Sequence, residues 1–153
     1  MKTKFSSLIK HFALTLLIGL ASISLLITNA STAFAGDLVF YEGNNCSQDV
    51  IATYDSSVDV NDNCKDTSRC DNDEARSLLI KGPVEYTTVD VYDSPDGGRD
   101  DDFSIIRIRS VSGGDSVCIG TFEKDYDDGD VQVIYEKDNG LDGKISHITV
   151  IPF

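Results

Sequence analysis

The side chains of this sequence with the clearest chemical potential are carboxylates gathered in short polar segments. Residues 93–102 hold five Asp, and residues 125–130 hold four. Ca²⁺ takes six to eight oxygen ligands from carboxylates, carbonyls and water, and loops between strands can supply them. Extracellular modules of this kind bind Ca²⁺ with dissociation constants of about 10⁻⁴–10⁻³ M. The segments therefore predict weak cation sites, and the alternative is that they are solvated acidic loops that maintain solubility.

Other chemistries find less support in the sequence. The segment 138–143 has the spacing of an EF-hand start, but position 12 of that loop is Thr149, where a bidentate Glu is expected. Beyond residue 35 the sequence has one histidine, His147, which lies in an apolar strand pattern. It has no serine-hydrolase elbow, zinc-protease motif or phosphate-binding loop. We expect no enzyme, although a carboxylate pair of the hydrolase type stays open.

The charge balance restricts the kind of partner. The chain has 26 Asp+Glu against 13 Lys+Arg, a net charge of −13, and 21 of the acids are Asp. Three of the bases are Lys2, Lys4 and Lys10, so residues 36–153 set 10 bases against 26 acids, a net charge of −16. This acidity argues against nucleic acids and charged lipid surfaces as partners. The Asp excess also disfavours long helices.

The first 35 residues have the pattern of a secretory signal peptide. Lysines come first, the apolar stretch Phe12–Ile27 follows, and Ala33-Phe34-Ala35 forms a small-x-small cleavage site. We expect cleavage after Ala35, leaving a single domain over 36–153 that is secreted, extracellular or periplasmic, with no membrane attachment. The alternative is an uncleaved membrane anchor.

The cysteines agree with export. Cys46, Cys64, Cys70 and Cys118 all follow residue 35, and an even number in a secreted chain indicates disulfides. Four cysteines allow three pairings, and the sequence does not choose among them. We expect Cys46–Cys64 and Cys70–Cys118. The five residues between Cys64 and Cys70 do not match zinc-ligand spacing.

The elements that must position these residues are short strands. Alternating or β-branched runs between turn-rich gaps predict about eight of them, in an antiparallel sandwich or barrel. One helical turn is possible at Asp71–Ala75. The predicted strands are Leu38–Glu42, Val50–Tyr54, Ser77–Lys81, Thr87–Tyr92, Ser104–Arg109, Ser116–Phe122, Asp130–Glu136 and Lys144–Ile151.

A weak internal repeat accompanies the strands. An aromatic residue followed by an acid occurs at Tyr41-Glu42, Tyr92-Asp93 and Tyr135-Glu136. Each pair is followed by a turn, acidic residues, a hydroxyl and an apolar strand. Repetition of this kind suggests similar motifs that pack together.

The same residues resemble the βγ-crystallin family. Segment 38–45 looks like the opening of its Greek-key motif, and Asn72-Asp73-Glu74-Ala75-Arg76-Ser77 resembles its calcium motif, N/D-N/D-x-x-S/T-S. Segments 100–105 and 142–147 are looser matches. The resemblance implies an all-β, antiparallel Greek-key sandwich in which Ca²⁺ is held by acid or amide groups, main-chain carbonyls and a hydroxyl shared between motifs. The implied ligands are Asn72, Asp73, Asp100, Asp101, Ser104, Asp142 and Ser146.

The sequence also departs from the family pattern. Cys46 and Gln48 stand where the opening usually has an aromatic residue and a Gly. Arg76 replaces the ligand hydroxyl of the first motif, which puts a cation where Ca²⁺ needs an oxygen. Gly143 replaces an acid or amide of the third motif, and Ile105 and His147 replace the closing Ser of the other two.

These observations predict an exported monomer with disulfides within the chain. It would act as a non-enzymatic binding or structural module with weak Ca²⁺ binding. The alternative is a secreted effector that binds an unknown protein partner, such as a peptidase inhibitor or toxin, through the segment Asn61–Asp71. A small carboxylate hydrolase is the third hypothesis.

Overall fold

The computed structural model describes residues 35–153, which form an all-β unit. Residues 1–34, which hold nearly all of the predicted signal peptide, lie outside the described residues, so that expectation stays a prediction. Residues 35–153 contain no helix, and so no helix with the length and apolarity to cross a membrane. The strands are β1 (Asp37–Gly43), β2 (Ser47–Asp55), β3 (Val60–Asn63), β4 (Ser77–Lys81), β5 (Val84–Tyr92), β6 (Phe103–Val111), β7 (Ser116–Ile119), β8 (Tyr126–Asp127), β9 (Val131–Glu136) and β10 (His147–Ile151).

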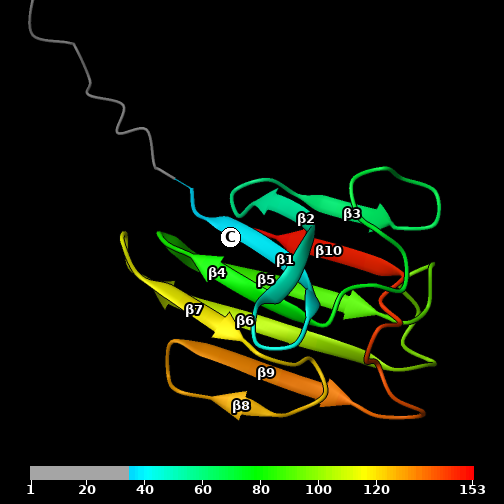
Figure 1. The fold of residues 1–153 in the computed structure, drawn as a ribbon. Coiled ribbons are helices and arrows are strands. Elements are labelled where there is room, and N and C mark those ends of the chain that lie inside the picture. The colour runs from blue at the N-terminus through cyan, green and yellow to red at the C-terminus, as the bar shows by residue number, and fades with distance from the viewer. Residues whose placement is uncertain (1–34) are drawn as a thin grey trace, which may run out of the picture. The chain divides into compact units, whose positions relative to one another are not determined.

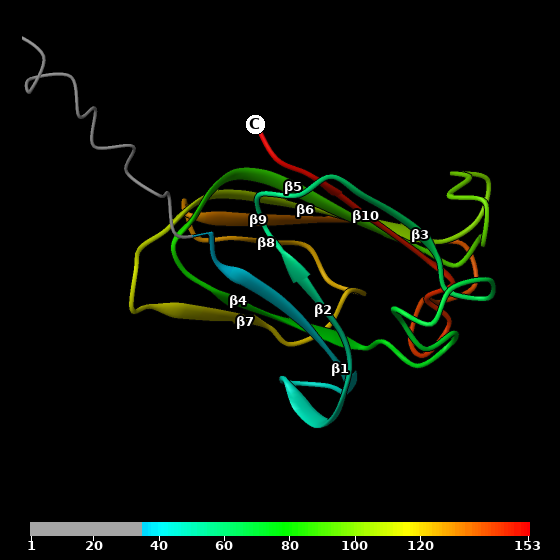
Figure 2. The same ribbon diagram turned by 90° about the horizontal axis from the view of Figure 1, so that it is seen from above.

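The strands form two antiparallel sheets. One has four strands in the order β2-β1-β4-β7, and the other has six in the order β3-β10-β5-β6-β9-β8. Seen from above, the sheets lie as two layers (Figure 2). The predicted all-β class and the antiparallel arrangement are therefore confirmed.

The unit has two halves in chain order, β1–β4 and β5–β10. Each half contributes one strand to the sheet that the other half mainly forms (Figure 1). β3 follows β2 in the chain but pairs with β10 in the six-stranded sheet. β7 follows β6 but pairs with β4 in the four-stranded sheet. Because of this exchange, backbone hydrogen bonds join the two halves in both sheets.

All eight predicted strands are present, β4 with the predicted bounds and the other seven with at least one shifted end, and two further strands occur. The additions are β3 and β8, whose Asn- and Asp-rich sequences are typical of turns. β10 begins at His147 rather than at Lys144, because Lys144 closes a turn by donating its N–H to the carbonyl of Leu141. Residues 72–74 form a turn, and no helical turn follows from Asp71 to Ala75.

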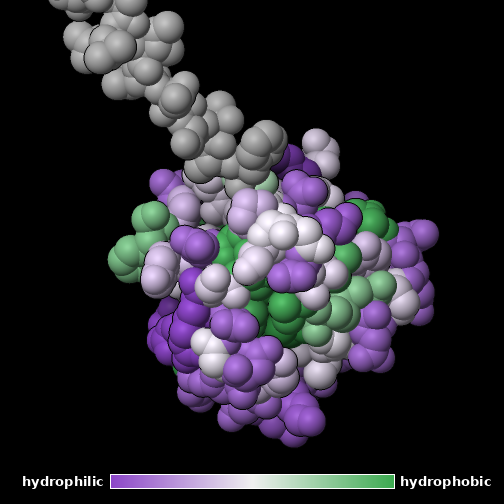
Figure 3. Space-filling view, turned by 90° about the vertical axis from the view of Figure 1, so that its left-hand side faces the viewer, coloured by the Kyte–Doolittle hydropathy of each residue, from purple (hydrophilic) through white to green (hydrophobic). Residues whose placement is uncertain are grey.

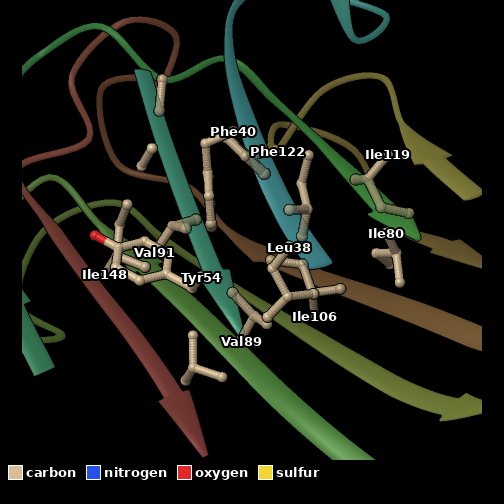
Figure 4. Packing of buried hydrophobic residues seen from close by; sticks show 14 of the residues in the cluster. Leu38, Phe40, Tyr54, Ile80, Val89, Val91, Ile106, Ile119, Phe122 and Ile148 are labelled. Carbon is tan, nitrogen blue, oxygen red and sulfur yellow. The ribbon is translucent and has the colours of Figure 1, made fainter. Parts of the chain in front are cut away.

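Alternate residues of the strands face one core between the sheets. Leu38 and Phe40 of β1 are fully buried, as are Val89 and Val91 of β5. The ring of Phe40 packs edge-on against Tyr54 with centroids 5.9 Å apart, and side chains of both sheets meet in the interlayer space (Figure 4). Burial of apolar surface at about 25 cal/mol per Å² is the main force that holds the layers together.

The end of the molecule that faces the viewer in Figure 3 carries the β8–β9 loop, at the left of Figure 1. It shows hydrophobic residues at its centre between hydrophilic edges. The loops β5–β6, β3–β4 and β9–β10 gather at the opposite end, at the right of Figure 1. The acidic residues of the β5–β6 and β9–β10 loops therefore lie at one end of the sandwich, and those of the β8–β9 loop lie at the other.

The disulfides are Cys46–Cys118 and Cys64–Cys70, so the expected pairing of Cys46 with Cys64 and Cys70 with Cys118 is wrong. β7 lies in the same sheet as β1, which brings Cys118 near the β1–β2 turn that carries Cys46. A hydrogen bond from Asn45 N to Gly120 O, 2.9 Å long, marks this contact. Cys64 and Cys70 instead flank a single loop after β3. The strand exchange that decides the pairing is not visible in the spacing of the cysteines.

Candidate metal centre

Two loops occupy equivalent places in the two sheets. The first loop, residues 72–77, leads into β4, and the second loop, residues 142–147, leads into β10. Arg76 N donates to Tyr41 O at 2.9 Å, and Ser146 N donates to Tyr92 O at 2.8 Å. Tyr41 is paired with Ser77, as Tyr92 is with His147. Position 76 therefore corresponds to position 146, and each other position of the first loop to the one 70 residues later.

The two loops contact each other directly. Ser146 Oγ donates a hydrogen bond to Asp73 Oδ1 at 2.9 Å, across 73 residues of sequence. Asp73 N donates to Ile145 O at 3.0 Å. The Ser146 hydroxyl also lies 3.5 Å from the carbonyl of Lys144. Two of the predicted ligands, Asp73 and Ser146, are thus brought together with a main-chain carbonyl.

A group of carboxylates lies near Lys144 and includes Asp93, whose pKa is raised by burial and in part by the charge of Asp73. Oxygen atoms of Asp93, Asp101 and Asp102 lie within 4.8 Å of one another. Burial raises the pKa of Asp93, and the charge of Asp101 raises it further, while Lys144 opposes the rise. Lys144 Nζ lies 4.0 Å from Asp93 Oδ2. We call Ser146, Asp73, Lys144 and Asp93 the Ser146 cluster, in which negative charge exceeds positive charge.

The corresponding place in the first loop is filled by an arginine. Arg76 Nη1 donates to Glu42 O at 2.8 Å and to Glu74 O at 3.1 Å. Arg76 Nε lies 3.3 Å from Asp142 Oδ1, in the second loop. We call Arg76, Glu42, Glu74 and Asp142 the Arg76 cluster. The predicted ligand Asp142 thus faces a guanidinium.

The other predicted ligands lie in different surroundings. Ser104 is buried in β6 and donates to Ile134 O of β9, within the sheet. Asp100 is exposed. Asn72 Oδ1 is buried and accepts no hydrogen bond from residues 35–153. Its counterpart in the second loop is Asp142, the partner of Arg76.

Sequence reasoning missed Asp102, a fully buried carboxylate that holds the β9–β10 loop. It accepts hydrogen bonds from the backbone N–H groups of Asp138, Asn139 and Gly140, at 2.7–3.0 Å. It also accepts one from the hydroxyl of Tyr135 at 2.9 Å. Burial raises the pKa of Asp102, but these hydrogen bonds outweigh it and hold the pKa below its usual value. Asp102 therefore positions the second loop and is less free than Asp93 to ligate a metal.

Glu123 has a similar role on the same loop. Its Oε1 accepts hydrogen bonds from Leu141 N at 2.5 Å and Asp142 N at 2.9 Å. The sequence signal for Asp102 is the turn Asp138-Asn139-Gly140, whose backbone N–H groups have no partner in a strand and need another acceptor. Asp102 and Glu123 come from the end of the β5–β6 loop and from the loop after β7, which sequence spacing does not connect to the β9–β10 loop.

His147 joins three segments at this end. Its ring nitrogens lie 2.7 Å from Pro95 O, in the β5–β6 loop, and 2.6 Å from Asn61 Oδ1, in β3. The side chain is buried, and its ring packs edge-on against Tyr92. These contacts fix the loop that carries Asp93 relative to β10.

The loop closed by Cys64 and Cys70 is a compact turn. Asp66 N and Thr67 N both donate to Asn63 O at 3.1 Å, and Arg69 forms an ion pair with the buried Asp62. Lys65 is exposed on this loop. The loop is thus rigid, and its backbone is folded rather than extended.

Comparisons of the chain with protein-family models, curated proteins and solved structures gave no match. The geometry of the two loops is therefore the basis for any statement about function.

Proposed function

We propose that the chain is an exported, non-enzymatic binding and structural module of the βγ-crystallin type that binds Ca²⁺ weakly at the Ser146 cluster. The exchange of β3 and β7 supports this fold type, because paired Greek keys that each lend a strand to the other sheet would give this strand order. The two closed disulfides support export.

The hydrogen bond between Ser146 and Asp73 carries the calcium proposal. The family resemblance implies a hydroxyl and an acid shared between two motifs, and here these groups come from the two corresponding loops. Asp73 would supply a carboxylate oxygen, Ser146 a hydroxyl and Lys144 a carbonyl, all oxygen ligands of the kind Ca²⁺ prefers. By its correspondence to Glu42, Asp93 would supply its main-chain carbonyl.

The charge around the cluster also fits a cation. The raised pKa of Asp93 reflects a carboxylate that is partly buried near Asp101, with limited compensation from Lys144. A bound Ca²⁺ would neutralise part of this negative charge and link the β3–β4, β5–β6 and β9–β10 loops. Its contribution would be to rigidify this end of the sandwich.

Calorimetry and thermal unfolding with Ca²⁺ test the proposal on the chain produced with its N-terminal segment in an oxidising host. We expect a dissociation constant of about 10⁻⁴–10⁻³ M and a higher Tm at millimolar Ca²⁺ than at matched ionic strength in NaCl. D73N and S146A should each abolish both effects. D130N, in the acidic β8–β9 loop, is the matched control and should keep them. No heat and no Tm shift in the unsubstituted protein would refute the calcium proposal.

A protein-binding effector is the second candidate function, and the rigid loop between Cys64 and Cys70 favours it. The loop presents Lys65 to solvent on a disulfide-closed turn. Inhibition of a trypsin-like protease that K65A removes and C64A/C70A weakens would support this function. Because the loop is folded rather than extended, we place it second to Ca²⁺ binding.

A further inference from the structure

We propose that Arg76 is a built-in cation that takes the place of a metal ion in the Arg76 cluster, so that the first of two related sites works without metal. The inference rests on the proposed function for the interpretation of the two clusters as cation sites. The two clusters then have different sources of positive charge. The Arg76 cluster holds a cation that is part of the chain, and the Ser146 cluster takes a metal ion from solution.

The first step is the correspondence of the ligands. The backbone of Arg76 has the same place in its sheet as the backbone of Ser146 has in the other, as the matched hydrogen bonds to Tyr41 and Tyr92 show. Glu74 O, which accepts from Arg76, corresponds to Lys144 O beside the Ser146 hydroxyl. The guanidinium thus contacts two carbonyls and one carboxylate, a set of oxygens that a hard cation would also use.

The second step is an independent departure at Gly143, the counterpart of Asp73. A Cβ atom at Gly143 would lie 2.4 Å from Arg76 Nη2, so a side chain there would displace the guanidinium from its observed position. Backbone conformation does not explain the glycine. The φ of Gly143 is +65°, and Asp73 adopts nearly the same φ of +62° with a side chain. The missing carboxylate and the added arginine are therefore two parts of one replacement.

The third step concerns the chemistry of the group. A guanidinium stays charged across the physiological pH range and presents five donors in a rigid fork. It can therefore hold Glu42, Glu74 and Asp142 together at any Ca²⁺ concentration. The Arg76 cluster would keep the two loops joined when the Ser146 cluster has lost its ion.

The double variant R76S/G143D tests the inference, because it restores to the first site the Ser and Asp that the second site has. The +62° φ of Asp73 indicates that Asp is tolerated at position 143. We expect calorimetry to give one more bound Ca²⁺ than in the unsubstituted protein, and the Tm of R76S/G143D to depend more steeply on Ca²⁺. R107S, which removes an exposed arginine of β6, should leave both the stoichiometry and the dependence unchanged.

The outcomes separate this inference from the proposed function. Stoichiometries of one for the unsubstituted protein and two for the double variant support both. Stoichiometries of zero for the unsubstituted protein and one for the double variant support the role of Arg76 and refute calcium binding at the Ser146 cluster. Equal stoichiometries in a folded double variant overturn the inference.

A second measurement applies if R76S/G143D does not fold with or without Ca²⁺. R76Q keeps the length of the side chain but removes the charge, and we expect its Tm in EDTA to fall by about 4 °C or more. R107Q should change the Tm by far less. Equal shifts for the two variants would overturn the inference.

Discussion

Individual carboxylates at the loop end of this protein have opposite roles, although the sequence presents them as one acidic run. Asp102 is buried among backbone donors that stabilise its charge. Asp93 is partly buried near other acids that oppose its charge. The two residues should therefore respond oppositely when their charge is removed.

Replacement of Asp102 by Asn should destabilise the protein, because one of its two acceptor oxygens becomes a donor that faces backbone N–H groups. We expect a loss of about 2 kcal/mol at pH 7 in urea unfolding. The folded-state pKa of Asp102 lies below its unfolded value, so its stabilisation is present above the unfolded pKa and lost as the pH falls through the folded pKa. The difference between D102N and the unsubstituted protein should shrink in strong acid. D100N, at the exposed acid two residues earlier, should change stability little, and an equal loss there would contradict the assignment.

Replacement of Asp93 by Asn should have effects of opposite sign with and without Ca²⁺. Because the folded-state pKa of Asp93 is raised, its ionised form opposes folding above that pKa. D93N should therefore stabilise the protein in EDTA, by less than about 1 kcal/mol for a partly exposed charge. It should also weaken the Ca²⁺-dependent rise in Tm, because the cluster loses a charge. A lower Tm in EDTA would show that Asp93 is structural.

At the scale of elements, sequence patterns predict the strands that carry the core and miss those that depend on a partner. Val89 and Val91 alternate with polar residues, so β5 follows from its own residues. β3 has the sequence Val-Asn-Asp-Asn, typical of a turn, and is a strand because β10 pairs with it. The exchange of β3 and β7, and hence the disulfide pairing, is a tertiary property that no local pattern encodes.

The candidate site was predictable to a similar degree. Asp73 and Ser146 could be named from motif spacing, but their contact across the two sheets could not. The sequence also indicated that Arg76 puts a cation in a ligand position. That Gly143 makes room for its guanidinium requires the packing of the two loops.

The two disulfides should contribute unequally to stability, and the one that encloses more of the chain should contribute more. Cys46–Cys118 spans 72 residues of separation and Cys64–Cys70 spans 6. The chain-entropy estimate gives about 4 kcal/mol for the first and about 2 kcal/mol for the second. C46A/C118A should therefore unfold at a clearly lower urea concentration than C64A/C70A.

For Ca²⁺ binding, removal of the short disulfide Cys64–Cys70 should have the larger effect. Cys64 N donates to Ser146 O, so the short disulfide anchors a loop that contacts the Ser146 cluster directly. C64A/C70A should weaken Ca²⁺ binding more than C46A/C118A does, as measured by calorimetry below the unfolding temperature of both. The same rank order in both measurements would show that the disulfides act through global stability alone.

At the scale of the whole molecule, charge and edge geometry both favour a monomer. Residues 36–153 carry a net charge of −16, which opposes self-association. The sheets end in β2, β7, β3 and β8. β7 and β3 have four residues each, β8 has two, and β2 changes register against β1 near Tyr41. Short or irregular edge strands offer little template for pairing with another chain.

These two causes can be separated by salt. We expect light scattering after size exclusion to give a monomer at pH 7 both in dilute buffer and in ~0.5 M NaCl, where the Debye length is about half its physiological value. If charge alone kept the chains apart, a dimer would form in high salt. If the edges were open to pairing, a dimer would form in both buffers. A monomer in both, with association as the pH falls toward the sequence pI of about 4.3, would show that edge geometry prevents ordered pairing while charge maintains solubility.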